Sequence, residues 1–219
     1  MKDKIIFKNK GFDAILCLNG EISHFEYIAE NKCKIYCADG AANTLISNNI
    51  IPDYIIGDLD SVNVNEIKTR SNDIKIIEKP SQEKNDFEKV LDFLISKDKK
   101  NILIFGFQGG ELEHTLNNWS VLKKFAKHLN IIILHNDRYA IPIHKSIEIE
   151  LKANETISII PQATCNIKTK GLKWELDNET LELGTREGAR NITTSSTIKI
   201  DLNSGEYLLF IDSRYPYSF

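Results

Sequence analysis

The chain has 219 residues, of which 42% are hydrophobic, so it can form the core of one large domain or of two modest ones. Its 28 Lys and Arg against 31 Asp and Glu give a formal net charge of -3, which argues against a nucleic-acid-binding protein and favours small-molecule partners. No apolar run reaches the ~18 residues needed to cross a membrane, and MKDKIIFKNKGFD lacks the apolar centre of a secretion signal, so we predict a soluble, cytoplasmic protein.

Residues 13–135 alternate short apolar runs with longer amphipathic ones, the pattern of a parallel sheet whose strands are joined by helices. Strands are predicted at residues 14–18, 34–38, 54–57, 74–77, 101–107 and 130–135. Between them, apolar residues recur at helical spacing within residues 22–31, 41–49, 85–98 and 114–128. We therefore predict an N-terminal α/β domain over residues 1–139.

After Asp137 the pattern changes to short, alternating segments broken by Asn, Gly, Pro and Ser. Strands are predicted there at residues 146–151, 156–161, 165–169, 172–176, 197–202 and 206–212. Because no run of helical period appears among them, residues 140–219 are predicted to form a small antiparallel β-sandwich or barrel. HNDRYAIP, at residues 135–142, is the expected hinge between the two domains.

Carboxylates follow several of the predicted strands at the point where each strand ends. Asp39 follows the strand at 34–38, Asp58 and Asp60 follow the strand at 54–57, and Asp86 begins the helix after the strand at 74–77. In an open parallel sheet, ligands bind beyond the carboxyl ends of the strands, so these side chains are expected at one edge. Carboxylates held close together repel one another unless a cation or a proton lies between them, and oxygen ligands alone select a hard divalent ion. We predict Mg²⁺ bound by these four residues.

Glycines accompany the same strand ends and allow backbone N–H groups to approach phosphate oxygens. They are Gly20 in the Asn19-Gly20 turn, Gly40, Gly57 and the pair Gly109-Gly110. The segment FGFQGGELEHTLNN, at residues 105–118, runs from a strand into a helix, as anion-binding turns do, although it matches neither the Walker A loop nor the GxGxxG fingerprint. Metal ligands and phosphate-binding glycines together indicate phosphoryl chemistry.

Some residues of the predicted site have structural as well as functional interpretations. His114 and Asn118 lie four residues apart on one helix face, so they are expected to point together at a bound nucleotide. A histidine with its hydrogen bonds satisfied at the helix N-terminus is the alternative for His114. Asn85 or Asp86 could likewise cap the helix that they begin.

Six motifs occur in one order along nearly the whole chain. They are Asn19-Gly20, ADG at 38–40, PDYIIGDLDS at 52–61, SQEKNDFEK at 81–89, GGELEHTLNN at 109–118 and TKGLKWELDNETLELG at 169–184. Taken together they resemble the thiamine pyrophosphokinase family, also called thiamine diphosphokinase. The resemblance implies an enzyme that, with Mg²⁺, transfers a pyrophosphoryl group from ATP to the hydroxyl of thiamine and leaves AMP. It also implies a homodimer.

The resemblance further implies roles for individual residues. The catalytic carboxylates would be Asp58, Asp60 and Asp86, one of which accepts the hydroxyl proton. ATP is expected at the strand-end turns and the helices that follow them, namely at Asn19, Gly20, Asp39, Gly40, Gln82, Gly109, Gly110, His114 and Asn118. Thiamine is expected in the β-rich domain, at Trp174, Arg190 and Asn191. A buried core position is the other interpretation of the tryptophan.

Three other interpretations stay open on the sequence alone. Departures from the family pattern at Asn85, Glu111, Glu113 and Arg190 motivate a non-catalytic relative that binds thiamine or a nucleotide as a sensor. GDLDS, at residues 57–61, also fits the DxD motif of haloacid-dehalogenase-type phosphatases, with the first aspartate as nucleophile and the second as general acid. Finally, the acidic residues could form no more than a solvated loop surface.

Overall fold

The structure is a computed structural model that describes residues 3–7 and 9–218. It divides into two compact units, one of residues 11–136 and one that combines the described residues up to Lys10 with those from Asp137 onward. The division at Asp137 lies close to the boundary expected after residue 139. The N-terminal residues, however, contribute β1 (Asp3–Ile5) to the second unit, where it pairs in parallel with β10 (Ile147–Glu150), although the sequence analysis placed them in the first.

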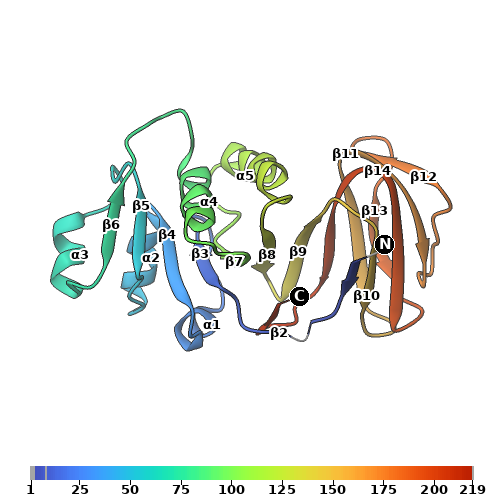
Figure 1. Cartoon of the computed structure of the whole chain (residues 1–219), viewed down its shortest axis with the longest axis horizontal. Helices are drawn as coiled ribbons and strands as arrows, with labels where there is room; N and C mark the ends of the chain where they lie inside the picture. Colours follow the sequence, from blue (N-terminus) through green and yellow to red (C-terminus); the bar gives the residue numbers. More distant parts are fainter. Residues whose placement is uncertain (1–2, 8, 219) are drawn as a thin grey trace. The chain divides into compact units, whose positions relative to one another are not determined.

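The first unit is built on six parallel strands (Figure 1). In spatial order they are β8 (Asn130–His135), β7 (Asn101–Phe105), β3 (Ala14–Cys17), β4 (Lys34–Ala38), β5 (Tyr54–Gly57) and β6 (Lys75–Glu78). Every neighbouring pair runs parallel. The residues of β3, β4 and β7 are almost all buried, which explains why these strands are continuous apolar runs in the sequence. Each strand predicted for this domain is confirmed, with small shifts at the ends.

The strands of the first unit are connected by helices. Within the described residues these are α1 (Phe25–Glu30), α2 (Ala41–Ser47), α3 (Val64–Arg70), α4 (Asp86–Ser96) and α5 (Leu112–Phe125). Helix α4 buries Phe87, Val90, Leu91 and Leu94, which recur three and four residues apart, and it packs on β4, β5 and α5 (Figure 1). Helix α3 was not predicted, because its seven residues include only two apolar ones.

The strand order reverses between β3 and β7, and this brings two loops together at the carboxyl edge of the sheet. From β3 the chain proceeds through β4, β5 and β6 before it returns to β7 on the other side of β3. The Gly20 N–H donates to the Gly106 oxygen at 3.0 Å. A Cβ on Gly20 would lie 2.3 Å from the backbone oxygen of Gln108, so the contact requires glycine. Crevices at such reversal points are where open α/β sheets bind ligands.

The second unit is β-rich, and its described residues contain no helix. Its longest strand, β14 (Thr197–Asp212), pairs antiparallel with β9 (Arg138–Ile143), β10 and β11 (Thr156–Lys170). Strand β11 also pairs with β12 (Glu179–Glu182) and β13 (Gly188–Ile192), and β2 (Asn9–Lys10) pairs with β15 (Tyr217–Ser218). The predicted fold class, a parallel α/β domain followed by a β-rich domain, is confirmed.

Some of the predicted elements in this unit were wrong. The two strands predicted at 156–161 and 165–169 form the single strand β11. They were predicted as separate strands because an irregularity that contains Ala163, with φ of 71°, interrupts the alternation of side chains. Those predicted at 197–202 and 206–212 likewise form one strand, β14, which contains Gly205 with φ of 82°. Residues 172–176, predicted as a strand, form a bend with a single bridge at Leu172. The segment predicted as a hinge, residues 135–142, contains most of β9, whose Tyr139 and Ile141 are buried.

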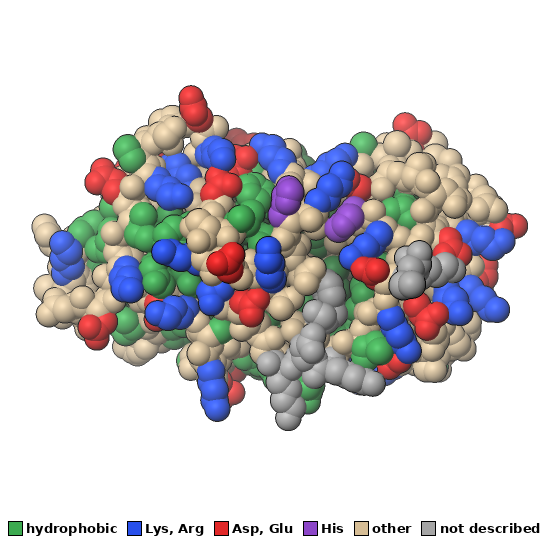
Figure 2. Space-filling view, in the orientation of Figure 1, with side chains coloured by type: hydrophobic (Ala, Val, Ile, Leu, Met, Phe, Trp, Pro, Cys, Tyr) green, Lys and Arg blue, Asp and Glu red, His purple; other side chains and the backbone are tan. Residues whose placement is uncertain are grey.

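The surface and the helices can be compared with the composition. None of the helices in the described part of the chain has the length and apolar content needed to cross a membrane. Figure 2 shows Lys and Arg side chains interspersed with Asp and Glu over the face drawn, as the nearly balanced charge of the sequence leads one to expect.

Candidate functional site

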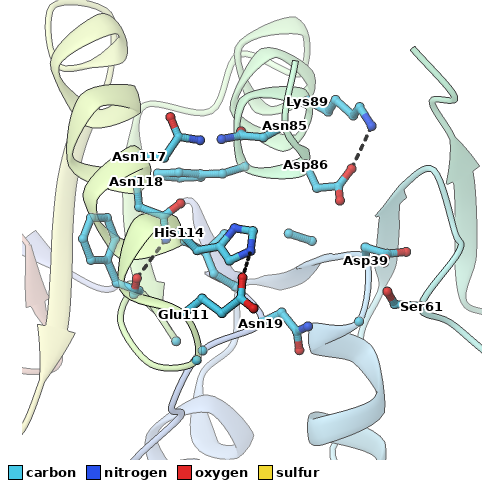
Figure 3. A pocket seen from close by; sticks show the side chains of 18 of the residues that line it. Asn19, Asp39, Ser61, Asn85, Asp86, Lys89, Glu111, His114, Asn117 and Asn118 are labelled. Carbon is cyan, nitrogen blue, oxygen red and sulfur yellow. Dashed lines mark hydrogen bonds and ion pairs between the residues drawn. The ribbon is translucent and has the colours of Figure 1, made fainter. Parts of the chain in front are cut away.

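A pocket of about 500 Å³ lies in the first unit, at the carboxyl edge of the sheet (Figure 3). It is lined by residues that follow β3, β4, β5 and β7 and by the first residues of α4 and α5. All of the residues that the sequence analysis assigned to ATP and metal line it, namely Asn19, Gly20, Asp39, Gly40, Asp58, Asp60, Gln82, Asp86, Gly109, Gly110, His114 and Asn118. The fold therefore gathers segments that span about a hundred residues of sequence into one site.

Three of the pocket carboxylates form a cluster, which we call the aspartate trio: Asp39, Asp58 and Asp60. One oxygen from each lies within 4.8 Å of the others. Asp39 is buried, and its Oδ1 has no hydrogen-bond partner. Burial raises the pKa of the Asp39 carboxyl, and the negative charges of Asp86, Asp60 and Asp58 raise it further, while the nearby Ser61 side chain opposes them. The ionised trio would therefore gain from a cation.

The other two members of the trio receive hydrogen bonds from neighbouring side chains. Gln82 Nε2 donates to Asp58 Oδ2 at 2.8 Å, and Ser61 Oγ donates to Asp60 Oδ1 at 2.8 Å. The bond from Gln82 lowers the pKa of Asp58, and the nearby charge of Lys89 lowers it further. Asp58 therefore stays ionised at neutral pH.

Asp86 lies beside the trio but is held by a different partner. Its Oδ1 accepts a hydrogen bond from Lys89 Nζ at 2.9 Å (Figure 3). The same nitrogen lies 4.0 Å from Asp58 Oδ2. Lys89 is buried, so its ammonium offsets the negative charge of the pocket from within the protein. A Cβ on Gly57 would lie 2.8 Å from the Cβ of Asp39 and 3.2 Å from Asp86 Oδ1. The absent side chain at the end of β5 thus leaves room for both aspartates.

The N-terminus of α4 is capped by Asn85. Its Oδ1 accepts a hydrogen bond from the Glu88 N–H at 2.8 Å, and the Glu88 side chain accepts one from the Asn85 N–H, which completes a capping box. The alternative role of Asp86 as the cap is therefore wrong. The side chain of Asp86 faces the pocket instead (Figure 3).

The glycine loop before α5 also borders the pocket. Gly109 and Gly110 adopt positive φ, at 116° and 70°. His114 Nε2 lies 3.3 Å from Glu111 Oε2, and both side chains are more than two-thirds exposed. Asn118 Nδ2 donates to the Phe107 oxygen at 2.9 Å, so this amide fixes the loop to the helix.

The three residues expected to bind thiamine lie in the second unit, in and beside β13. Asn191 brackets the backbone of Trp174, because its Oδ1 accepts from the Trp174 N–H and its Nδ2 donates to the Trp174 oxygen. The Trp174 side chain is exposed, which rules out the alternative of a core tryptophan, and Lys173 Nζ lies 4.7 Å from its ring centre. Arg190 adopts φ of 55°, and its N–H donates to Ser158 Oγ.

Sequence reasoning missed several polar residues that line the pocket: Ser61, Lys84, Lys89 and Asn117. One signal for Lys89 was available. It lies three residues after Asp86, on a helix whose Phe87, Val90 and Leu91 are apolar and buried, so a lysine at this position faces the protein. Nothing in the sequence distinguishes Lys84 from an ordinary surface lysine.

Comparisons with known families match both units. Residues 25–134 match the family described as "Thiamin pyrophosphokinase, catalytic domain", and residues 144–206 match "Thiamin pyrophosphokinase, vitamin B1 binding domain". The first match lies in the unit that holds the pocket. The second contains Trp174, Arg190 and Asn191.

Individual proteins show the same similarity. A Caenorhabditis elegans protein named thiamin pyrophosphokinase 1 is 30% identical over 214 residues, which cover 88% of this chain and 86% of that protein. The crystal structure of thiamine pyrophosphokinase from Bacillus subtilis has a TM-score of 0.77 at 22% identity and covers 92% of this chain and 99% of its own. The yeast thiamin pyrophosphokinase structure has a TM-score of 0.77 at 20% identity, with coverage of 97% and 91%. At these identities the structures show a shared fold.

The pairing of Lys89 with Asp86 predicts how stability responds to substitution. Lys89→Met keeps an apolar stem of similar length but removes the ammonium, so the free energy of unfolding should fall by about 1–3 kcal/mol in urea titrations. Lys124→Met is the control, because Lys124 of α5 is 58% exposed, although its Nζ lies 2.8 Å from Glu88 Oε1 of α4. That substitution should cost less than about 1 kcal/mol. Equal losses in the two variants would contradict a buried, charge-balancing role for Lys89.

Proposed function

The chain belongs to the thiamin pyrophosphokinase family, and from this premise we propose that it transfers the pyrophosphoryl group of ATP to the hydroxyl of thiamine, giving thiamine diphosphate and AMP. It is thus a transferase, as both family matches and the C. elegans relative indicate. The observation that carries the proposal is the aspartate trio in the pocket at the carboxyl edge of a parallel sheet, where such folds bind ligands.

The residues of the trio fit a magnesium ion. The donor set is three carboxylates without histidine or cysteine, which is the chemistry that Mg²⁺ prefers. A cation would provide a partner for the buried Oδ1 of Asp39, which has no hydrogen bond. It would also stabilise the ionised form of that carboxyl, whose pKa is raised. Asp39, Asp58 and Asp60 would hold the ion, while Asp86, the fourth predicted ligand, is paired with Lys89. When bound, magnesium supplies charge neutralisation on the phosphate oxygens.

The protein's own groups in the pocket position the reactants. Hydrogen bonds from Gln82 to Asp58 and from Lys89 to Asp86 fix the orientations of the two carboxylates. Asp86 is the candidate acceptor for the hydroxyl proton of thiamine, since it lies outside the trio and borders the pocket. Gly20 stays a predicted ATP contact, although its N–H already bonds to the Gly106 oxygen. We therefore assign backbone contacts with phosphate to Gly109 and Gly110.

The second unit supplies the proposed thiamine site. The thiazolium ring of thiamine is a cation, and the exposed ring of Trp174 already has an ammonium, that of Lys173, over its face. Asn191 would act indirectly, by holding the backbone of Trp174. Arg190 remains a predicted contact. The homodimer and the cytoplasmic location implied earlier also remain predictions.

The reaction itself provides the first test. Purified protein with ATP, Mg²⁺ and thiamine should yield AMP and thiamine diphosphate in equal amounts, measured by chromatography. Asp58→Asn should lower the rate by about 100-fold or more, because it removes a carboxylate proposed to hold the metal that neutralises the phosphates. The exposed Asp73→Asn should not change it. Folded protein that binds ATP and thiamine yet forms neither product would indicate the sensor interpretation instead.

Metal binding by the trio predicts opposite effects of Asp39→Asn with and without magnesium. The folded-state pKa of Asp39 is raised, so its ionised form opposes folding, increasingly as pH rises above the ordinary value of 3.8. Without divalent ions at pH 7, the variant should therefore be more stable than the wild type by about 1 kcal/mol. Added Mg²⁺ should raise the Tm of the wild type but not that of the variant. Equal Mg²⁺ shifts in both proteins would exclude Asp39 as a ligand.

The role of Trp174 predicts a selective effect on thiamine. Trp174→Ala should raise the KM for thiamine by about 2- to 30-fold, the range expected for loss of one cation–π contact. The KM for ATP should stay the same, and Trp174→Phe should show a smaller effect because a ring remains. A thiamine KM that is unchanged in the alanine variant would place the substrate elsewhere.

A further inference from the structure

The charge of the pocket is unbalanced for a site that receives a polyphosphate. Its lining carries five carboxylates, Asp39, Asp58, Asp60, Asp86 and Glu111. Within the described lining residues, the positively charged or titratable nitrogen groups belong to Lys84, Lys89 and His114. A nucleoside triphosphate adds further negative charge, so each cation in the pocket matters for its affinity.

Two of these three groups are paired with carboxylates of the pocket. Lys89 is buried, with its Nζ 2.9 Å from Asp86 and 4.0 Å from Asp58, and so it balances charges that the fold itself brings in. His114 lies 3.3 Å from Glu111, so that a protonated ring would form a pair with no net charge. Neither leaves a free positive charge for a phosphate.

Lys84 differs from both because its partner lies outside the pocket lining. It follows β6 and lies one residue before the cap of α4, and its Nζ is 2.6 Å from Asp92 Oδ2. Asp92 raises the pKa of this lysine through a hydrogen bond and through its charge, so the side chain is cationic. The two side chains are 53% and 37% exposed. Exposed pairs of this kind add little stability, so a phosphate can displace the aspartate.

We propose that Lys84 is a phosphate-binding residue of the nucleotide site, and that Asp92 holds it at the rim until ATP binds. The lysine then exchanges the carboxylate of Asp92 for the polyphosphate, while the N-terminal amides of α4 beside it favour the same negative charge. The inference rests on the proposed function for the identity of the ligand. It concerns binding and can therefore be tested without turnover.

The test measures the affinity of Lys84→Met for a non-hydrolysable ATP analogue with Mg²⁺, by calorimetry without thiamine. The Kd for the analogue should rise about 10-fold, as expected for the loss of one charge-assisted contact. The Kd for adenosine, which lacks phosphates, should stay the same. Lys84→Arg should bind the analogue nearly as the wild type does. Asp92→Asn should bind it about two- to threefold more tightly, because the lysine no longer has to leave a partner.

Lys124→Met is the matched control, because Lys124 is 58% exposed and paired with a carboxylate, Glu88, but does not line the pocket. Its Kd for the analogue should equal that of the wild type. An analogue Kd within twofold of the wild type in Lys84→Met, or an equal loss of adenosine binding, would overturn the inference even if the wild type forms thiamine diphosphate. Conversely, a wild type that binds the analogue through Lys84 but forms no AMP would overturn the proposed function alone. A wild type that does not bind the analogue contradicts both.

Discussion

Repulsion between carboxylates is the constraint on which the pocket depends. Adjacent parallel strands β4 and β5 end at the same edge of the sheet, so Asp39 and Asp58 meet there whatever their charges. The protein offsets part of that repulsion with its own groups, through the buried ammonium of Lys89 and the side-chain amide of Gln82. The negative charge of Asp39 is less well offset, since its Oδ1 is buried without a hydrogen bond. The remaining imbalance is the physical basis for proposing a divalent ion.

The backbone makes this concentration of charge sterically possible. Gly57 ends β5 without a side chain and leaves room for Asp39 and Asp86, and Gly20 lets the loops after β3 and β7 bond to each other at the reversal point. The same edge also receives the N-terminus of α4, capped by Asn85. Charged side chains are thus brought together by rigid elements. Rigid placement is what pyrophosphoryl transfer needs, since positioning and charge stabilisation supply most of its catalysis.

Much of this edge could be predicted from the sequence, because Asp39, Asp58 and Asp60 lie within three residues of the end of an apolar strand. The parallel sheet and the gathering of Asp39, Asp58 and Asp60 followed from that pattern alone. Lys89 was missed because a lysine in an amphipathic helix ordinarily faces solvent, and its approach to Asp58 depends on the packing of α4 on β5. In the second unit, the irregularity at Ala163 and the bend at residues 172–176 depend on pairing between distant segments, which local alternation does not record.

Anomalous diffraction from crystals grown with Mn²⁺ and a non-hydrolysable ATP analogue tests the central claim most directly. The account predicts one manganese peak about 2.1 Å from an oxygen of each of Asp39, Asp58 and Asp60, with phosphate oxygens of the analogue completing its coordination. Analogue bound in the pocket with the three carboxylates turned apart, and with manganese absent or held by other residues, would contradict it.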